Sequence, residues 1–407
     1  MNTGDTAWLL ISTALVMLMT PGLALFYGGM VQGKNVLSTF MHSFFALALV
    51  SVQFAVIGYS LAFGPSWHGI IGGCDFAGLA GITEQSTHGS VPTLAFVAYQ
   101  CMFAVITPAL ISGAYAERFK FSAYVVFTLA WTTLVYDPIA HWTWGDGGWL
   151  AQLGAIDFAG GTVVHLSSGI SALVVALVLG KRRGYPTVRH PPHDLTMTVL
   201  GAGLLWFGWF GFNAGSAPGA GGTAALALVN THLAAAAGAL TWVIVEGSRI
   251  KKATMLGAAS GLVAGLVAIT PAAGYVSPVV AIFIGIAAGA VCYGAVLAKG
   301  RLGYDDALDA FGVHGVGGAT GALLTGVFAR AALNNGVGGG LSLMGKQVTS
   351  IAASAAWAAV VTFVLLKAID LTIGLRVDAE VEHDGLDGAL HGESAYGSPG
   401  SVAHGSS

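Results

Sequence analysis

The sequence predicts an all-α membrane protein with eleven transmembrane helices. Hydrophobic residues make up 55% of the 407 residues and charged residues only 9%, whereas a soluble domain carries about a quarter charged residues. The chain therefore cannot cover a water-facing surface. Its 60 glycines are about twice the usual share, which suits close approach of helices in a bilayer. Two further observations, the apolar segments and the positions of the basic residues, give the number and direction of the helices.

A membrane span needs about 20 mainly apolar residues, and the sequence contains eleven such segments. The first segment is expected to be a true span and not a cleaved signal peptide, because residues 1–7 contain Asp5 and no Lys or Arg. Many segments are interrupted by Gly, Pro or a single polar residue, as in helices that line a cavity. The expected spans are 8–31, 40–63, 92–115, 122–141, 160–180, 197–214, 223–246, 254–270, 276–298, 307–328 and 347–373.

The basic residues alternate between loops. The loops after spans one, three, five, seven and nine hold 12 of the 16 Lys and Arg residues, and the loops after spans two, four, six and eight hold none. Cytoplasmic loops carry the excess of Lys and Arg. The N-terminus is therefore predicted outside and the C-terminus in the cytoplasm. The 12 residues are Lys34, Arg118, Lys120, Lys181, Arg182, Arg183, Arg189, Arg249, Lys251, Lys252, Lys299 and Arg301.

Spans one to five and six to ten form two blocks, followed by one last helix. Because each block has an odd number of spans, the second block is inverted relative to the first. His165 near the start of span five and His314 near the start of span ten occupy corresponding positions. They are expected to enter the membrane from opposite faces and to converge near its middle. Inverted repeats with a site at their interface are typical of transporters.

Each of these histidines follows an aspartate by eight residues, in Asp157-Phe-Ala-Gly-Gly-Thr-Val-Val-His165 and from Asp306 to His314. Two separate histidines bonded to backbone carbonyls are one interpretation, and a functional pair of neutral imidazoles is the other. Asp157 could cap the free N–H groups of span five, supply a negative field for a cation, or do both. Capping is also the simpler interpretation for Asp306 and Asp309.

Two aromatic strings lie at the predicted external face. They are His141-Trp-Thr-Trp144-Gly-Asp-Gly-Gly-Trp149, outside span four, and Trp206-Phe-Gly-Trp-Phe-Gly-Phe-Asn-Ala-Gly-Ser216, ending span six. Tryptophans at this depth are usually interfacial anchors. An aromatic cup with one hydroxyl would instead bind a small cation through its π-faces and one hydrogen bond.

Other chemistry finds little support in the sequence. The three cysteines have no metal-ligand spacing, and no basic patch with aromatic interleaving indicates nucleic-acid binding. We therefore expect no metal, cofactor or nucleic-acid partner. Gly340-Leu-Ser-Leu-Met-Gly-Lys346 resembles a phosphate loop, but Gln347 replaces the required Ser or Thr.

Residues 1–375 are expected to form the membrane domain. Residues 376–407, rich in acidic residues, Gly, Ser and His, are expected to form a cytoplasmic tail ordered at most by a partner.

At these strings the chain resembles the ammonium transporter (Amt/MEP/Rh) family, in particular the bacterial Amt branch. The resemblance covers residues 8–375, and 385–393 also resembles the Amt tail. It rests on Pro21-Gly-Leu-Ala-Leu-Phe-Tyr-Gly-Gly29, Gln100-Cys-Met-Phe103, Asp157-Phe-Ala-Gly-Gly-Thr-Val-Val-His165, Trp209-Phe-Gly-Phe-Asn-Ala-Gly-Ser216, Ile269-Thr-Pro-Ala-Ala-Gly-Tyr275 and Asp309-Ala-Phe-Gly-Val-His314-Gly.

The resemblance implies a multi-pass protein of the plasma (inner) membrane that takes up ammonium, with methylammonium as a candidate second substrate. It implies a homotrimer with one pore per subunit and a P-II signalling protein of the GlnB/GlnK type as cytoplasmic partner. By matching motif, Phe103, Trp144 and Ser216 look like an external recruitment site shaped by Asp157. Phe103 and Phe212 look like the gate, and His165 and His314 line the pore.

Three alternatives stay open beside an ammonium transporter. A Rh-type pore for NH3 or CO2 would not need the recruitment site formed by Trp144 and Ser216. An ammonium sensor would need an output domain, which the short tail does not resemble. An intramembrane enzyme using the histidines as acid and base lacks an accompanying nucleophile or metal set, so we expect no enzyme. Among departures from the family, Asp146 adds a charge beside Trp144, and the external loop 64–91 is unremarkable.

Overall fold

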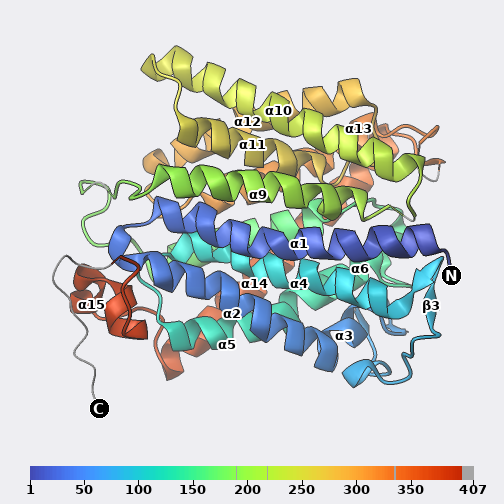
Figure 1. Ribbon diagram of the computed structural model, residues 1–407, viewed down its shortest axis with the longest axis horizontal. Coiled ribbons are helices and arrows are strands. Elements are labelled where there is room, and N and C mark those ends of the chain that lie inside the picture. The colour runs from blue at the N-terminus through green and yellow to red at the C-terminus, as the bar shows by residue number, and fades with distance from the viewer. Residues whose placement is uncertain (189, 218, 334–335, 397–407) are drawn as a thin grey trace.

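Ten long apolar helical segments lie side by side along the long axis of the molecule (Figure 1). The computed structural model describes residues 1–188, 190–217, 219–333 and 336–396. Within these residues, ten segments are long and apolar enough to cross a membrane. They are α1 (Thr3–Met30); η1, α2, η2 and α3 (Gly33–Asn35, Val36–Gln53, Phe54–Gly58 and Tyr59–Phe63); α4 (Thr93–Tyr115); α5, η4, α6 and α7 (Phe121–Trp131, Thr132–Tyr136, Asp137–Trp144 and Trp149–Leu153); η5 and α8 (Gly161–Leu166 and Ser167–Leu179); α9 (Leu195–Ala214); α10 (Gly222–Ile250); α12 (Pro278–Leu302); η6 and α13 (Phe311–Gly315 and Val316–Phe328); and α14 (Leu341–Thr372).

The predicted spans agree with these helices, with one short helix among them. The expected span 254–270 is α11 (Met255–Ile269), whose 15 residues are shorter than the ten others. Every residue of α11 from Gly261 to Ile269 is buried, because α11 lies inside the bundle against α10 and α12. The structure therefore contains ten or eleven membrane-crossing helices, depending on whether α11 is counted.

Several helix ends lie three to six residues from their predicted positions; α1, for example, begins at Thr3 and not at residue 8. Span four was expected to end at residue 141, but α6 continues to Trp144, so part of the first aromatic string is helical and not in a loop. The last span was expected from residue 347, but α14 begins at Leu341, directly after Gly340 with its φ of 138°. These three errors arise because hydropathy reports the hydrocarbon core, whereas these helices extend beyond it.

Small elements close the two ends of the bundle. The N end carries the N-terminus, the short η3 (Ala77–Leu79) and two two-stranded antiparallel hairpins, β1 (Ser66–Trp67) with β2 (Ile71–Gly72) and β3 (Thr87–His88) with β4 (Val91–Pro92). The opposite end, called the tail end, carries α15 (Ala379–Asp384) and η8 (Asp387–His391). The first helices of the two blocks, α1 and α9, run in opposite directions. For α1 and α9, Trp8 Nε1 donates to Ala214 O over 3.2 Å at one end, and Asp194 N donates to Gly29 O over 3.1 Å at the other.

The tail is docked on the membrane domain itself. Asp387 accepts hydrogen bonds from Leu37 N (3.0 Å) and Ser38 N (2.8 Å), and so caps the start of α2. Leu386 N donates to Asn35 Oδ1 over 2.8 Å. The expectation that the tail is ordered only by a partner is therefore wrong for residues 376–396, because its polar side chains satisfy the free N–H groups of a helix. Residues 397–407 lie outside the described part of the chain.

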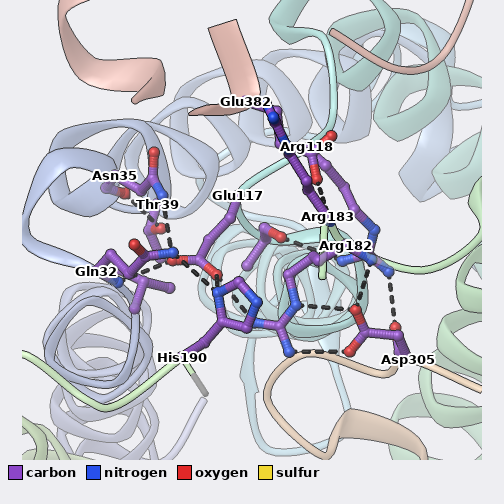
Figure 2. A network of polar contacts seen from close by, with 12 residues as sticks. Gln32, Asn35, Thr39, Glu117, Arg118, Arg182, Arg183, His190, Asp305 and Glu382 are labelled. Carbon is purple, nitrogen blue, oxygen red and sulfur yellow. Dashed lines mark hydrogen bonds and ion pairs between the residues drawn. The ribbon is translucent and has the colours of Figure 1, made fainter. Parts of the chain in front are cut away.

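A buried cluster of Glu117, Arg182 and Asp305, the Arg182 cluster, ties the loops of the tail end together (Figure 2). Arg182 pairs with Glu117 at 2.8 Å and with Asp305 at 2.9 Å. Burial of the carboxyls favours their neutral forms, but the attraction of Arg182 outweighs it and lowers the pKa of both Glu117 and Asp305. Asn35, which holds the tail, also donates to Glu117 over 3.1 Å. The cluster therefore joins the tail to the loop before His314.

Removing the central charge of this cluster is expected to destabilise the protein. Arg182→Gln would leave two buried carboxylates without their ion-pair partner, with only Arg118 still near Asp305. Loss of one partner of a buried pair typically costs about 3–5 kcal/mol. We expect a lower temperature of unfolding in detergent than for wild type or for the control Arg183→Gln, whose side chain is exposed. The stabilisation is fully present above the unfolded pKa values of about 4 and is lost as pH falls through the lowered folded values. The difference between the variant and wild type should therefore shrink in acid, and an equal melting temperature at neutral pH would contradict the assignment.

Candidate functional site

A cavity of about 540 Å³ opens at the N end, between α1, β3 and β4, α4, α6 and the segment after α9. We call it the vestibule. Its lining includes the four residues that the sequence assigned to one site, Phe103, Trp144, Asp157 and Ser216. The loop 64–91, considered unremarkable from its sequence, also contributes His88 to the wall. The vestibule therefore brings together residues from α1, the loop 64–91, α4, α6, the segment before η5 and the segment after α9.

Phe103 and Trp144 lie at the floor of the vestibule, and Phe212 lies beneath Phe103 and lines the cavity below. The rings of Phe103 and Trp144 meet edge to face, with centroids 6.0 Å apart at 87°. Trp144 Nε1 donates to Asp157 O over 2.9 Å, which fixes the orientation of the indole. Phe103 and Phe212 stack at 4.1 Å and 15°. Both phenylalanines are buried, and their stacked rings separate the vestibule from the apolar cavity below.

Ser216 supplies a hydroxyl whose lone pairs remain available. Its Oγ donates to Phe212 O over 2.9 Å, so the proton is used within the turn that ends α9. Tyr99 Oη lies 3.1 Å from the same oxygen and also contacts the Gly211 and Phe212 carbonyls. The hydroxyl is thus held in place as an acceptor. Cup and acceptor together suit a small cation with N–H donors.

Asp157 is a helix cap. Its carboxylate accepts five hydrogen bonds of 2.6–3.2 Å, from the backbone N–H groups of Gly160, Gly161, Thr162 and Val163 and from Thr162 Oγ1. Asp306 does the same for η6, accepting from Ala310 N (3.1 Å) and Phe311 N (2.8 Å). The capping interpretation is therefore confirmed for both aspartates at the two matching helix starts. Asp309 instead pairs with Lys299 at 2.5 Å, so capping is wrong there.

His165 and His314 meet inside the bundle. Their Nδ1 atoms lie 3.3 Å apart, and their rings are nearly parallel, with centroids 5.4 Å apart at 23°. Both lie in short π-helical segments, η5 and η6, which are frequent at functional sites. Both side chains are buried. The pairing predicted from the inverted blocks is therefore present in the structure.

Glycines allow these two segments to cross closely. A Cβ on Gly169 would lie 2.0 Å from Gly315 N, and a Cβ on Gly318 would lie 2.6 Å from Gly161 O. Larger side chains at these positions would push α8 and α13 apart. The short crossing distance is what allows the two histidine rings to touch.

A narrow apolar cavity of about 10 Å³ contains the histidines and lies below the stacked phenylalanines. This volume is near the minimum for one water-sized molecule. When both rings are neutral, the histidine whose Nδ1 donates to the other Nδ1 has an unprotonated Nε2, which is an acceptor. The second histidine carries its proton on Nε2, which is therefore a donor. The pair can therefore bind a small molecule that both donates and accepts. Within the described residues, no group of three His, Cys, Asp or Glu side chains could hold a metal ion.

Sequence reasoning missed Trp209 as part of this site. Its ring stacks on His165 with centroids 5.3 Å apart, and its Nε1 donates to Thr270 Oγ1 over 3.0 Å. A signal was present, since Trp209, Phe212 and Ser216 follow one another at spacings of three and four residues. Such residues share one face of a helix.

Three comparisons relate the chain to known proteins. A family model described as Ammonium Transporter Family matches residues 7–396. The chain is 52% identical to a protein of Bacillus subtilis named ammonium transporter, over 97% of this chain and 99% of that protein. The structure resembles that of Mep2 from Saccharomyces cerevisiae, with a TM-score of 0.89 and 40% identity over 93% of this chain and 88% of that one. It also resembles a solved structure named Sensor Amt Protein, with a TM-score of 0.90 and 30% identity over 95% of this chain and 98% of that one.

Proposed function

Because this chain belongs to the ammonium transporter family, we propose that it recruits NH4+ at the vestibule and conducts NH3 past His165 and His314. The observation that carries the proposal is the order in which the vestibule, the stacked phenylalanines and the histidine cavity follow one another. An aromatic cup with a free acceptor at Ser216 lies above stacked phenylalanines, and a water-sized apolar cavity with the two histidines lies below them. The vestibule suits a cation, and the apolar cavity excludes charge. This order fits a substrate that loses its charge between the vestibule and the apolar cavity.

The chemistry follows from the cost of desolvating an ion. A bare ammonium ion in the apolar cavity would lose its hydration without gaining a counter-charge. Loss of one proton in the vestibule gives NH3, which has both a lone pair and N–H groups. The two free imidazole nitrogens of His165 and His314, one donor and one acceptor, match those groups. The proton crosses separately, relayed by the hydrogen-bonded imidazoles of His165 and His314, so that one positive charge moves with each NH3. Trp144, Phe103 and Ser216 hold the cation, Phe103 and Phe212 form the gate, and Asp157 fixes the helix start beside them.

We also propose a topology and partners for the protein. The N end faces outward and the tail end faces the cytoplasm, in a multi-pass plasma-membrane protein with eleven spans and two inverted repeats. Residues 1–375 form the transport domain, and residues 376–407 form a regulatory tail. The basic residues near the tail end support this direction. By family resemblance, the protein forms a homotrimer and binds a P-II protein at its cytoplasmic face.

Currents from reconstituted protein after an ammonium jump would test the transport proposal. We expect an ammonium-dependent current, and Ser216→Ala should raise the half-saturating concentration about tenfold, because a hydrogen bond to a charged group contributes about 1.5 kcal/mol or more. Ser248→Ala, at an exposed serine near the tail end that bonds within its own helix, is the control and should leave the concentration unchanged.

The same recordings separate the alternatives. A pH change in the vesicles without current would favour a Rh-type pore for neutral gas. Specific ammonium binding without flux would favour a sensor, the role that the name Sensor Amt Protein gives to one structurally similar protein. Either result would overturn the proposal that the protein moves ammonium together with a charge, and only the second would overturn transport itself.

A further inference from the structure

A second large cavity, of about 410 Å³, lies at the tail end between α15 and the segments that follow α1, α4 and α8. We call it the tail cavity. Its volume falls in the usual range for sites that bind small molecules, roughly 300–1,000 Å³. Part of its wall is the network around Arg182 that Figure 2 shows. Seven of its ten lining residues carry an ionisable side chain, so a ligand that fills it must be charged or strongly polar.

The two carboxylates in the wall of the tail cavity are already satisfied. Glu117 accepts hydrogen bonds from Arg182 Nη1 (2.8 Å) and Gln32 N (2.8 Å). Glu382 accepts a hydrogen bond from Arg376 Nη2 over 2.8 Å, and this pair lies within the tail itself. These carboxylates therefore leave little negative charge to draw a cation into the cavity.

Two cationic side chains in the same wall have no such counter-charge. Among the described residues, no carboxylate lies within 4.0 Å of Lys34 Nζ or of the Arg183 guanidinium. Lys34 Nζ donates only to the backbone carbonyl of His383, and Arg183 contacts Glu382 through its backbone N–H (2.8 Å) and not through its side chain. Both cationic side chains are at least partly exposed. The tail cavity thus presents two uncompensated positive charges that a ligand can reach.

A phosphate group fits these two side chains better than a single carboxylate. A phosphate monoester carries about 1.5–2 negative charges at neutral pH, whereas a carboxylate carries one and would leave the second cation unpaired. The planar guanidinium of Arg183 can bind two phosphate oxygens at once, and the Lys34 ammonium group binds phosphate as a point charge. His383, from the tail, adds an imidazole that has an N–H donor in either protonation state.

We propose that the tail cavity binds a small soluble molecule that carries a phosphate group, held by Lys34, Arg183 and His383. Lys34 and Arg183 belong to the membrane domain, whereas His383 belongs to α15 of the tail. A ligand that contacts both parts stabilises the docked tail, because it binds the docked form and not the released one. The tail cavity would bind its ligand whether or not the protein moves ammonium, so the test needs no transport measurement.

The test uses the full chain in detergent, with inorganic pyrophosphate as the probe and no divalent cation added. We expect pyrophosphate to raise the melting temperature by about 2 °C or more above its value in sodium chloride of equal ionic strength, which controls for screening. Amide hydrogen exchange across residues 379–391 should also slow by at least about threefold, because release of the tail becomes rarer.

Arg183→Gln and Lys34→Gln each remove one charge partner of the ligand. Each should raise the apparent dissociation constant for pyrophosphate at least about tenfold. Lys34→Gln also loses its bond to His383 O, so both variants are compared with and without pyrophosphate, and the difference between these two conditions is the measurement. Lys252→Gln is the matched control, because Lys252 is exposed and lies outside the cavity. It should respond to pyrophosphate like wild type.

Two results would overturn this site. One is a wild-type protein whose melting temperature and tail exchange do not respond to pyrophosphate. The other is an equal response in wild type, Arg183→Gln and Lys34→Gln, which would place binding elsewhere. Soluble dihexanoyl phosphatidic acid, tested in parallel, distinguishes a lipid headgroup from a soluble ligand. A response to it without one to pyrophosphate would also contradict the proposal.

Discussion

His165→Asp is expected to make the protein conduct potassium. In the wild type, the narrow cavity around His165 and His314 offers only apolar surface and two buried imidazoles, so an ion that cannot lose its charge is excluded. A carboxylate at this position attracts a cation by about 4 kcal/mol at about 4 Å and an effective dielectric of about 20. The measurement is the current after a potassium jump, and the ratio of ammonium to potassium current should fall about tenfold or more.

His314→Glu should act in the same direction, since the two rings are in contact from opposite repeats. His165→Asn is the matched control, because it removes the imidazole without adding a charge and should pass no potassium. It separates the effect of charge from that of a wider pore. Transport and selectivity that stay at wild-type values in both acidic variants would mean that the histidine pair is structural.

The membrane helices could be predicted closely because their signal is local. About 20 apolar residues identify a span whatever surrounds them, and basic residues such as Lys34 and Arg118 mark the loops at one face. The π-helical segments η5 and η6 could not be predicted this way. They arise where glycines such as Gly169 and Gly318 let two helices cross at backbone contact, and that contact depends on residues about 150 positions apart.

The residues of the vestibule were predicted unevenly for the same reason. Phe103, Trp144 and Ser216 were found through matching motifs, and the pairing of the histidines through the inverted blocks. His88 was not found, because it reaches the wall of the vestibule through the fold of the loop 64–91, which carries no motif of its own.

The tail was mispredicted because its composition resembles that of a disordered segment. Its order comes from particular long-range bonds. Asp387 caps a helix that begins about 350 residues earlier, and Arg376 Nη1 donates to Leu179 O over 3.1 Å. Composition describes the average tendency of a segment, whereas a single well-placed carboxylate can decide whether it docks.

Asp157 makes more of the hydrogen bonds that hold the site together than any other residue described above. Its five hydrogen bonds start η5, the segment that carries His165, and its backbone carbonyl holds the Trp144 indole. A charged cap of this kind satisfies N–H groups that nothing else nearby can reach. The carboxylate also faces the positive end of a helix. Loss of the side chain would therefore disturb the cup and the histidine pair together.

Asp157→Ala is accordingly expected to abolish ammonium current and to lower thermal stability in detergent, because four buried N–H groups lose their acceptor, at about 1–3 kcal/mol for each group left unsatisfied. Asp157→Asn keeps one acceptor oxygen and should be intermediate in both measurements. Asp146→Ala removes a nearby but exposed acid and serves as the control for loss of negative field. If only the negative charge of Asp157 mattered, Asp157→Asn would be as inactive as Asp157→Ala, and both variants would unfold at the wild-type temperature. A graded loss of stability across alanine, asparagine and wild type would instead show that Asp157 acts by holding the helix start, with transport following from the geometry that it fixes.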